Sequence, residues 1–141
     1  MIYVDTSVLV ALVVHEPGSA AAAAWYEAAR SELVSATWCV TEFASALGLK
    51  QRRAQLDADQ ALEAWERFQR LVAHDLRLLP VEMVDFHRAA LLTLEGASSI
   101  RAADSLHLAC AERVGARSLA TLDRVMARNA ARVKLRPLTL I

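Results

Sequence analysis

The sequence predicts a single α/β domain in which a short central parallel sheet is flanked by helices on both faces. Short apolar runs, such as residues 33–36 and 118–121, alternate with longer segments whose apolar residues recur at helical spacing. This alternation is typical of parallel sheets, because strands covered on both faces are apolar throughout. The 141 residues contain no repeat, no low-complexity linker and only three prolines, so we expect one domain over residues 1–141.

The first half of the chain is predicted to contain two strands and four helices. A buried strand at the N-terminus is followed by a helix that Thr6 or Ser7 caps. Pro17 suits the first turn of an alanine-rich helix, because its fixed φ angle fits that position. Asp57 and Gln60 have the spacing of a capping box at the start of another helix. The expected elements are strand 1–5, helix 8–14, helix 17–30, strand 33–36, helix 39–53, and a helix from residue 57 whose inner stripe is Leu62, Trp65, Phe68, Gln69 and Val72.

The second half is predicted to contain three further strands and three helices. Gly96 ends one helix, and Gly115 occupies the position after another helix where glycine is favoured. Pro137 restricts the last strand to an edge of the sheet, because proline has no N–H to donate to a neighbouring strand. The expected elements are strand 77–79, helix 84–95, helix 100–113, strand 118–121, helix 123–131 and strand 133–141.

Composition narrows the class of protein. A hydrophobic fraction of 55% with 23% charged residues excludes a disordered chain. No apolar run reaches the roughly 20 residues that span a membrane, and the N-terminus does not have the pattern of a signal peptide. Cys39 and Cys110 do not form a Cys-x-x-Cys motif, so we expect buried thiols in a cytoplasmic protein. With 16 basic and 16 acidic residues, the chain has no overall basic field for nucleic acid.

Four acidic residues lie at the ends of apolar segments or inside them. Asp5 and Asp123 follow apolar runs, while Glu42 and Asp104 lie inside segments that otherwise appear buried. Acidic side chains are rarely buried unless they are paired. Either basic partners neutralise them one by one, or the four converge and share a cation. Because the functional crevice of a parallel sheet lies beyond the carboxyl ends of its strands, we expect them to converge.

The four acids define a specific chemistry if they meet. Carboxylates held close together raise one another's pKa unless a cation offsets their charge. An all-oxygen set of ligands favours Mg²⁺ or Mn²⁺ over zinc, and such an ion promotes hydrolysis of phosphodiesters. We expect Asp5 and Asp104 to bind the ion directly, with Glu42 and Asp123 completing the site.

Each acid also has a structural explanation when it is taken alone. Asp5 and Asp123 could cap the helices that follow them, Glu42 could pair with an arginine, and Asp104 could complement a helix dipole. Their joint occurrence in one small α/β chain favours the shared site. His107 lies one helical turn after Asp104, and it could either face the site or pack in the core.

Four segments of the chain resemble the motifs of PIN domains. They are residues 1–9 (MIYVDTSVL), 41–42 (TE), 102–109 (AADSLHLA) and 120–123 (ATLD), and their order and spacing are similar over essentially the whole chain. The length of the chain resembles that of the VapC toxins of bacterial toxin–antitoxin pairs. The resemblance implies the three-layer PIN-like fold and an endoribonuclease that depends on Mg²⁺ or Mn²⁺ and cleaves transfer or ribosomal RNA.

The resemblance also implies partners and site residues. It implies a homodimer and a small VapB-type antitoxin whose C-terminal segment enters the acidic groove. The alternative is a catalytically inactive PIN-like module that binds RNA or protein. The acids that match the family are Asp5, Glu42, Asp104 and Asp123, with Thr6, Ser7 and Thr121 as residues that support them. The candidates for contact with RNA phosphates, which the motifs do not fix, are Arg52, Arg53, Arg101, Arg124 and Arg128.

Overall fold

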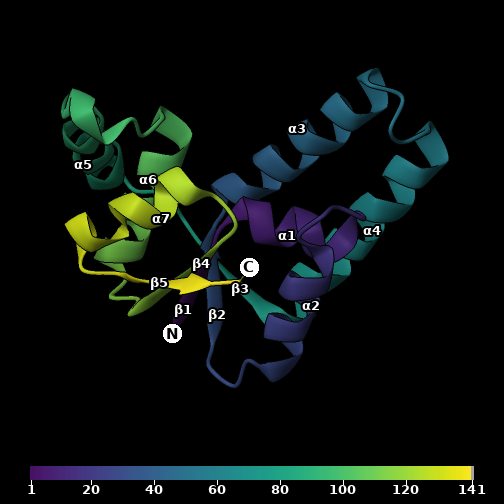
Figure 1. Cartoon of the computed structure of the whole chain (residues 1–141), viewed down its shortest axis with the longest axis horizontal. Helices are drawn as coiled ribbons and strands as arrows, with labels where there is room; N and C mark the ends of the chain where they lie inside the picture. The colour runs from purple at the N-terminus through teal and green to yellow at the C-terminus, as the bar shows by residue number, and fades with distance from the viewer. Residues whose placement is uncertain (141) are drawn as a thin grey trace.

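A computed structural model describes residues 1–140, apart from the side chain of Thr139. Within this part of the chain there are five strands, seven α-helices and two short 3₁₀ turns (Figure 1). In order they are β1 (Ile2–Val4), α1 (Thr6–Val13), α2 (Ser19–Ala28), β2 (Leu33–Ala36), α3 (Trp38–Arg52), α4 (Ala58–Asp75), β3 (Leu76–Leu79), α5 (Met83–Leu94), a 3₁₀ turn (Gly96–Ser98), α6 (Ala102–Arg113), β4 (Ser118–Thr121), α7 (Arg124–Asn129), a 3₁₀ turn (Ala130–Val133) and β5 (Arg136–Thr139).

The strands form one parallel sheet in the order β3-β2-β1-β4-β5. The register places Tyr3 of β1 opposite Val34 of β2 on one side and Leu119 of β4 on the other. The chain builds outward from β1 to β3 and then returns to add β4 on the other side of β1. Because all strands are parallel, their carboxyl ends lie at one edge, and the crevice for a ligand is expected where the strand order reverses, between β1 and β4.

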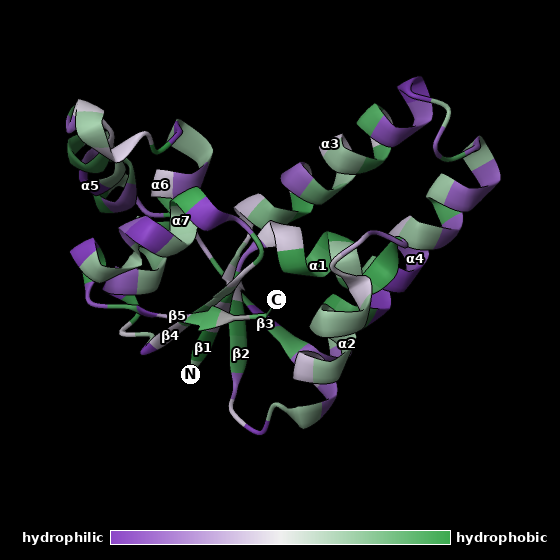
Figure 2. Cartoon of the chain, viewed as in Figure 1, coloured by the Kyte–Doolittle hydropathy of each residue, from purple (hydrophilic) through white to green (hydrophobic). Residues whose placement is uncertain are grey.

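Helices cover both faces of the sheet, which confirms the predicted α/β fold with three layers. Strand side chains alternate between two apolar clusters, as the pleat of a strand requires. Val4 packs with α1, α2, α3 and α4 on one face, whereas Tyr3 packs with α5, α6 and α7 on the other. Figure 2 shows hydrophobic colour along β1 and through most of α1. The two faces are therefore distinguished by single-residue alternation along β1.

The N-terminal ends of α1 and α2 differ from the prediction. Helix α1 begins at Thr6, so Thr6 and Ser7 lie inside the helix and do not cap it. Their hydroxyls bind the carboxylates of Glu42 and Asp5 instead. Helix α2 begins at Ser19 and not at Pro17, as the prediction had it. Pro17 lies in the turn that precedes the helix.

Helix α4 begins as predicted, and its predicted inner stripe is confirmed at Trp65, Phe68 and Val72, whereas Leu62 and Gln69 are exposed. Asp57 Oδ1 accepts from the Gln60 backbone N–H at 2.8 Å, and Gln60 Oε1 accepts from that of Asp57 at 2.9 Å. The predicted inner position Leu62 is wrong, since 58% of its surface is exposed. The buried positions in this part of the helix are Ala61 and Ala64, one or two residues away from Leu62 and on another side of the helix.

The C-terminal elements are shorter than predicted. The expected helix 123–131 is divided into α7 and a 3₁₀ turn, and the last strand covers Arg136–Thr139 only. Residue 141, which the prediction included in that strand, lies outside the described residues. Pro137 lies in β5, an edge strand as expected, and Gly115 has a φ of +74° after α6. None of the helices within residues 1–140 combines the length and apolarity that crossing a bilayer requires.

Candidate active site

Two of the four acids lie at the carboxyl ends of neighbouring strands. Asp5 directly follows β1, and Asp123 lies two residues beyond the end of β4. The pairing of the strands continues to Asp5, whose backbone N–H donates to the Ala120 carbonyl at 3.0 Å. Parallel pairing of two short apolar strands therefore brings together acids that are 118 positions apart in the sequence.

Two hydroxyls hold one oxygen of the buried Asp5 carboxylate. Asp5 Oδ2 accepts from Ser7 Oγ at 2.7 Å and from Thr121 Oγ1 at 2.9 Å. Each hydroxyl in turn accepts from a backbone N–H, Ser7 from Leu122 and Thr121 from Asp123, both at 3.0 Å. These N–H groups leave the hydroxyl protons to point at the carboxylate, so the backbone after β4 fixes the position of Asp5.

Glu42 is positioned by α1 and α6. Its Oε1 accepts from Thr6 Oγ1 at 2.7 Å and from Nε2 of His107. The alternative that an arginine pairs with Glu42 is not what the structure shows, because its ionic partner is His107. His107 is fully buried, and its other ring nitrogen, Nδ1, lies 2.7 Å from the Tyr3 hydroxyl. The helical spacing from Asp104 was the only signal in the sequence that His107 belongs to the site.

Asp104 lies in the first turn of α6, and the charges of other acids affect its pKa. Burial and the charges of Asp5 and Asp123 raise the pKa of Asp104 to about 6. Arg101 Nε is 3.8 Å from Asp104 Oδ2, but Arg101 is 82% exposed and only partly offsets the effect. Asp104 is therefore within electrostatic reach of two acids from other elements of the fold.

Asp123 combines a capping role with a position in the site. Its Oδ1 accepts from the Met126 backbone N–H at 3.0 Å and so caps α7. In Asp123, as in Asp5 and Glu42, only one oxygen of the carboxylate accepts hydrogen bonds from the protein. Within residues 1–140, no hydrogen bond reaches the second oxygen of any of these three carboxylates.

The donor chemistry of the site fits a hard divalent cation. Within the described residues, no three His, Cys, Asp or Glu side chains are arranged closely enough to form a complete set of ligands. All four acids offer oxygen, and the charges of Asp5 and Asp123 on Asp104 are those that a cation would offset. Mg²⁺ characteristically binds through only one or two carboxylates and keeps several waters, so it does not require a closed cage of protein ligands.

The groups behind Glu42 have perturbed pKa values. Burial favours neutral His107, but the hydrogen bond to Glu42 and the charges of Asp5, Glu42 and Asp104 outweigh it and raise the pKa of His107. Burial is also the main reason that the pKa of Tyr3 lies well above its usual value. Tyr3 is therefore a neutral phenol at physiological pH and retains a proton to donate.

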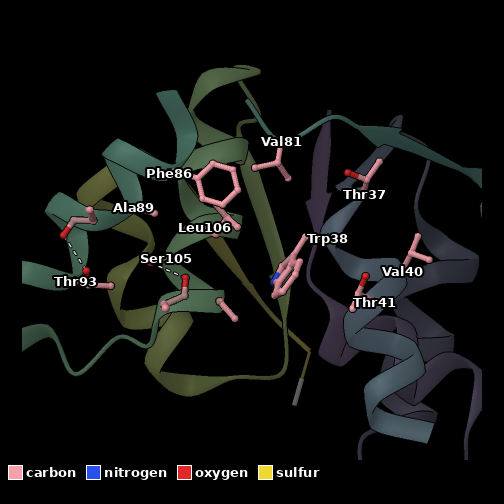
Figure 3. A pocket seen from close by; sticks show the side chains of 13 residues that line it. Thr37, Trp38, Val40, Thr41, Val81, Phe86, Ala89, Thr93, Ser105 and Leu106 are labelled. Atoms are coloured by element: carbon pink, nitrogen blue, oxygen red, sulfur yellow. Dashed lines mark hydrogen bonds between the residues drawn. The ribbon is translucent and has the colours of Figure 1, made fainter. Parts of the chain in front are cut away.

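An apolar cavity of about 860 Å³ adjoins the acids, between α3 on one side and α5 and α6 on the other (Figure 3). Trp38 lines the α3 side, and Phe86 and Leu106 lie across the cavity from it. Thr41 and Ala103 also line it, and they are the neighbours in sequence of Glu42 and Asp104. Glu42 and Asp104 therefore lie on the same two helices as the lining of the cavity, each one residue away from it.

The candidate arginines fall into two groups. Arg101 lies one turn from Asp104, and Arg124 and Arg128 line a hollow of about 410 Å³ that Asp123 also lines. Arg52 and Arg53 lie at the far end of α3, roughly 15 Å along the helix from Glu42. The structure thus brings three of the five arginines close to the acids.

The sequence and the fold identify the family. The sequence model of the PIN domain matches residues 2–132. The chain belongs to the PIN domain family. This confirms the resemblance seen in the four motifs, and PIN domains are generally nucleases. No curated protein matches the chain in sequence.

Solved structures of PIN proteins share the fold. FitAcB from Neisseria gonorrhoeae has a TM-score of 0.73 and 19% identity, covering 99% of this chain and 98% of that chain. VapC20 from Mycobacterium tuberculosis, described as a toxin that cleaves the sarcin–ricin loop, has a TM-score of 0.73 and 17% identity, covering 91% and 94%. VapBC2 from Rickettsia felis, bound to a DNA fragment from their promoter, has a TM-score of 0.64 and 15% identity, covering 98% of both chains. At these identities the similarity shows that the fold is shared.

Proposed function

We propose that this PIN domain is an endoribonuclease that depends on Mg²⁺ or Mn²⁺ and hydrolyses phosphodiester bonds of RNA. One observation carries the proposal: burial, together with the charges of Asp5 and Asp123, raises the pKa of Asp104 at the edge where the strand order reverses. Mutual repulsion of this kind is offset when a divalent cation binds. The unused second oxygens of Asp5, Glu42 and Asp123 support the same function.

Each residue of the site has a proposed role. Asp5 and Asp104 hold the ion, while Glu42 and Asp123 complete its surroundings. When bound, the ion supplies positive charge that stabilises the charge developing on a phosphate. The hydroxyls that orient the carboxylates are those of Thr6, Ser7 and Thr121. The arginines near the acids that we propose to contact RNA phosphates are Arg101, Arg124 and Arg128.

The proposed biological role is that of the toxin in a VapBC-type pair. VapC20, a neighbour in fold, is described as a toxin that cleaves the sarcin–ricin loop, which supports RNA as the substrate class. We propose that transfer or ribosomal RNA is cleaved in the cytoplasm and that translation stops as a result.

The proposed partner is a small antitoxin of the VapB type. The assemblies FitAcB and VapBC2 among the structural neighbours support a partner protein. The apolar cavity with acids at its side suits a segment whose apolar side chains enter the cavity while a basic side chain reaches the acids. Such a segment would block the acids and the groove with one contact surface.

We also propose that the chain forms a homodimer through α5. This helix exposes several large apolar side chains, and a face of this kind is typical of a protein interface. The exposed residues are Met83, Val84, Leu91 and Leu94, at 72%, 62%, 58% and 78%. Light scattering of the purified chain tests the proposal, since Leu91→Lys with Leu94→Lys should shift a dimer to a monomer.

The nuclease function is tested with purified protein and transfer RNA. The parent should cleave with Mg²⁺ or Mn²⁺ and stop in EDTA, whereas Asp104→Asn should be slower by at least roughly 100-fold. Glu63→Gln, which changes an exposed acid on α4, is the matched control and should cleave like the parent. Equal rates for Asp104→Asn and the parent in Mg²⁺ would refute the assigned role. A parent that neither binds Mn²⁺ nor cleaves RNA would favour the inactive binding module.

A further inference from the structure

We infer that Tyr3 and His107 are positioning residues that fix the Glu42 carboxylate through a buried hydrogen-bond relay. The relay begins at the backbone N–H of Ala36, at the end of β2, which donates to the Tyr3 hydroxyl at 3.1 Å. The Tyr3 hydroxyl lies 2.7 Å from His107 Nδ1, and Nε2 of the same ring contacts Glu42 Oε1. The inference rests on the proposed function, because it assigns a purpose to the orientation of Glu42.

The direction of each proton follows from the partners. The Tyr3 hydroxyl accepts from the Ala36 N–H, so its single proton is free to point at His107 Nδ1. In the neutral ring Nδ1 is then an acceptor and the ring proton lies on Nε2, where it faces Glu42; in the protonated ring Nε2 carries a proton as well. The phenol thus selects the tautomer of His107 that donates to the carboxylate.

The relay leaves one oxygen of Glu42 for other use. Thr6 Oγ1 and His107 Nε2 both reach Oε1, so two donors from different helices determine how the carboxylate is rotated. Within the described residues, no hydrogen bond reaches Oε2. A carboxylate that is held by one oxygen presents the other in a fixed direction, which is how groups behind metal ligands act in metal sites.

Packing alone does not explain the relay. Tyr3 and His107 are each fully buried, and Tyr3 belongs to an apolar cluster with Val34, Leu108 and Leu119. Polar groups in such a position are destabilising unless all of them are paired, and apolar residues of similar size would fill the space without that requirement. The edge-to-face contact of the two rings, 5.7 Å between centroids, keeps the hydroxyl aligned with Nδ1.

The first test measures Mn²⁺ binding by calorimetry, which does not depend on RNA cleavage. Tyr3→Phe removes only the hydroxyl and leaves the tautomer of His107 unselected, so the Kd for Mn²⁺ should rise about 10-fold. His107→Leu should raise it by about 10- to 100-fold, while His107→Gln, whose amide can donate to Glu42, should remain within about threefold of the parent. Leu108→Val, a buried change beside His107 that leaves the relay intact, should bind like the parent.

A double-mutant cycle separates positioning from a general structural effect. If Tyr3 acts through Glu42, then Tyr3→Phe should not weaken Mn²⁺ binding further when Glu42 is already alanine. If Tyr3 only supports the fold, its effect should be the same in both backgrounds, and Leu108→Val should weaken binding by a similar factor. Thermal unfolding of every variant shows which changes reduce stability, and Tyr3→Phe keeps the test valid if His107→Leu does not fold.

The outcomes distinguish this inference from the proposed function. A parent that binds Mn²⁺, with Tyr3→Phe, His107→Leu and His107→Gln all binding equally well, would overturn the relay and leave the nuclease proposal intact. A parent that binds no Mn²⁺ would overturn the proposed metal dependence, and the relay with it.

Discussion

The crevice between α3 and α6 has two sides, one acidic and one apolar, and both helices contribute residues to each side. On α3, Thr41 lines the apolar cavity and Glu42 belongs to the acids; on α6, Ala103 and Asp104 are divided in the same way. Successive residues of a helix point about 100° apart, so two neighbouring residues can lie on different sides of the crevice, one acidic and one apolar. The same two helices therefore contribute to two neighbouring surfaces of opposite chemistry.

The two sides differ in how their side chains are held. On the acidic side, hydroxyls, an imidazole and backbone N–H groups each reach a single oxygen of a carboxylate. On the apolar side, Ala89, Ala90 and Thr93 of α5 leave open space opposite Trp38. The acidic side has fixed geometry, as catalysis requires, and the apolar side has volume, as recognition requires. Substitutions should therefore separate cleavage from partner binding.

The largest effect is expected from Asp5→Asn. This change should lower RNA cleavage by at least roughly 100-fold, because Asp5 is both a proposed metal ligand and the acceptor for Ser7 and Thr121. Binding to the proposed antitoxin should weaken much less than cleavage, since the cavity is unchanged and Asp5 is only one of the acids that the basic side chain of the antitoxin would reach. The measurements are cleavage of labelled transfer RNA and titration of the partner, with exposed Asp59→Asn as the control. Loss of both activities together would mean that the two sides are not separable.

The reciprocal change is Phe86→Ala on the apolar side. Aromatic anchors at interfaces often contribute about 2 kcal/mol, so partner binding should weaken by roughly 30-fold while free enzyme cleaves RNA at the parental rate. Phe86 is 54% exposed, and its removal should not unfold the chain. Phe86→Leu, which keeps an apolar side chain, should retain most of the affinity. Unchanged inhibition by the antitoxin in Phe86→Ala would exclude this cavity as the docking site.

Asp104 makes stability depend on pH in the protein without metal. The pKa of Asp104 is raised from 3.8 to about 6 in the folded state. Protonated Asp104 therefore contributes its full share to the free energy of unfolding below about pH 4, and this contribution is lost as pH rises through about 6. In EDTA, Asp104→Asn should therefore be more stable than the parent at pH 7.5, by about 1 kcal/mol after allowance for solvent screening. At pH 4 the two should be similar.

Urea unfolding at both pH values measures this difference. Mn²⁺ at pH 7.5 should stabilise the parent more than Asp104→Asn, because an ion that binds only the folded state adds to its stability. A difference between the two proteins that is the same at pH 4 and pH 7.5 would show that Asp104 does not titrate as described.

The smallest effect is expected from the arginines. Arg124→Ala should raise KM for RNA by about three- to tenfold and reduce the salt dependence of binding by about one charge, because it would remove one of the proposed phosphate contacts beside Asp123. Arg53→Ala, at the far end of α3, should leave both quantities unchanged. If Arg53→Ala has the larger effect, RNA lies along α3 rather than over the hollow that Asp123 lines.

The sequence predicted the strands better than the helix ends. Residues 33–36 and 118–121 form strands with the expected bounds, because these short runs of apolar and small polar residues are buried along their whole length. The start of α1 was wrong because Thr6 and Ser7 bind carboxylates elsewhere in the fold instead of the backbone beside them. A residue with two possible hydrogen-bond partners gives an ambiguous local signal.

The candidate site was predictable where it follows from strand order. Asp5 and Asp123 were expected at one edge because β1 and β4 were recognised as strands, and parallel strands present their ends together. The pairing of Glu42 with His107 was not predictable, since it depends on how α3 and α6 approach each other across 65 positions of sequence. For Asp123, the sequence offered a helix cap and a site residue as alternatives. Both apply, because Asp123 caps α7 and its charge also acts on Asp104.

Parallel strands place all their amino ends at the edge of the sheet opposite the acids, and that edge is a place for engineering. Ser31, Gly115 and Arg117 lie there in exposed loops, before β2 and β4 begin. A fluorophore or an affinity tag joined at these loops would be separated from the acids by the full length of the strands. Proteins labelled in this way would allow the proposed cleavage and partner exchange to be followed one molecule at a time, while the edge of the sheet that carries the acids stays unmodified.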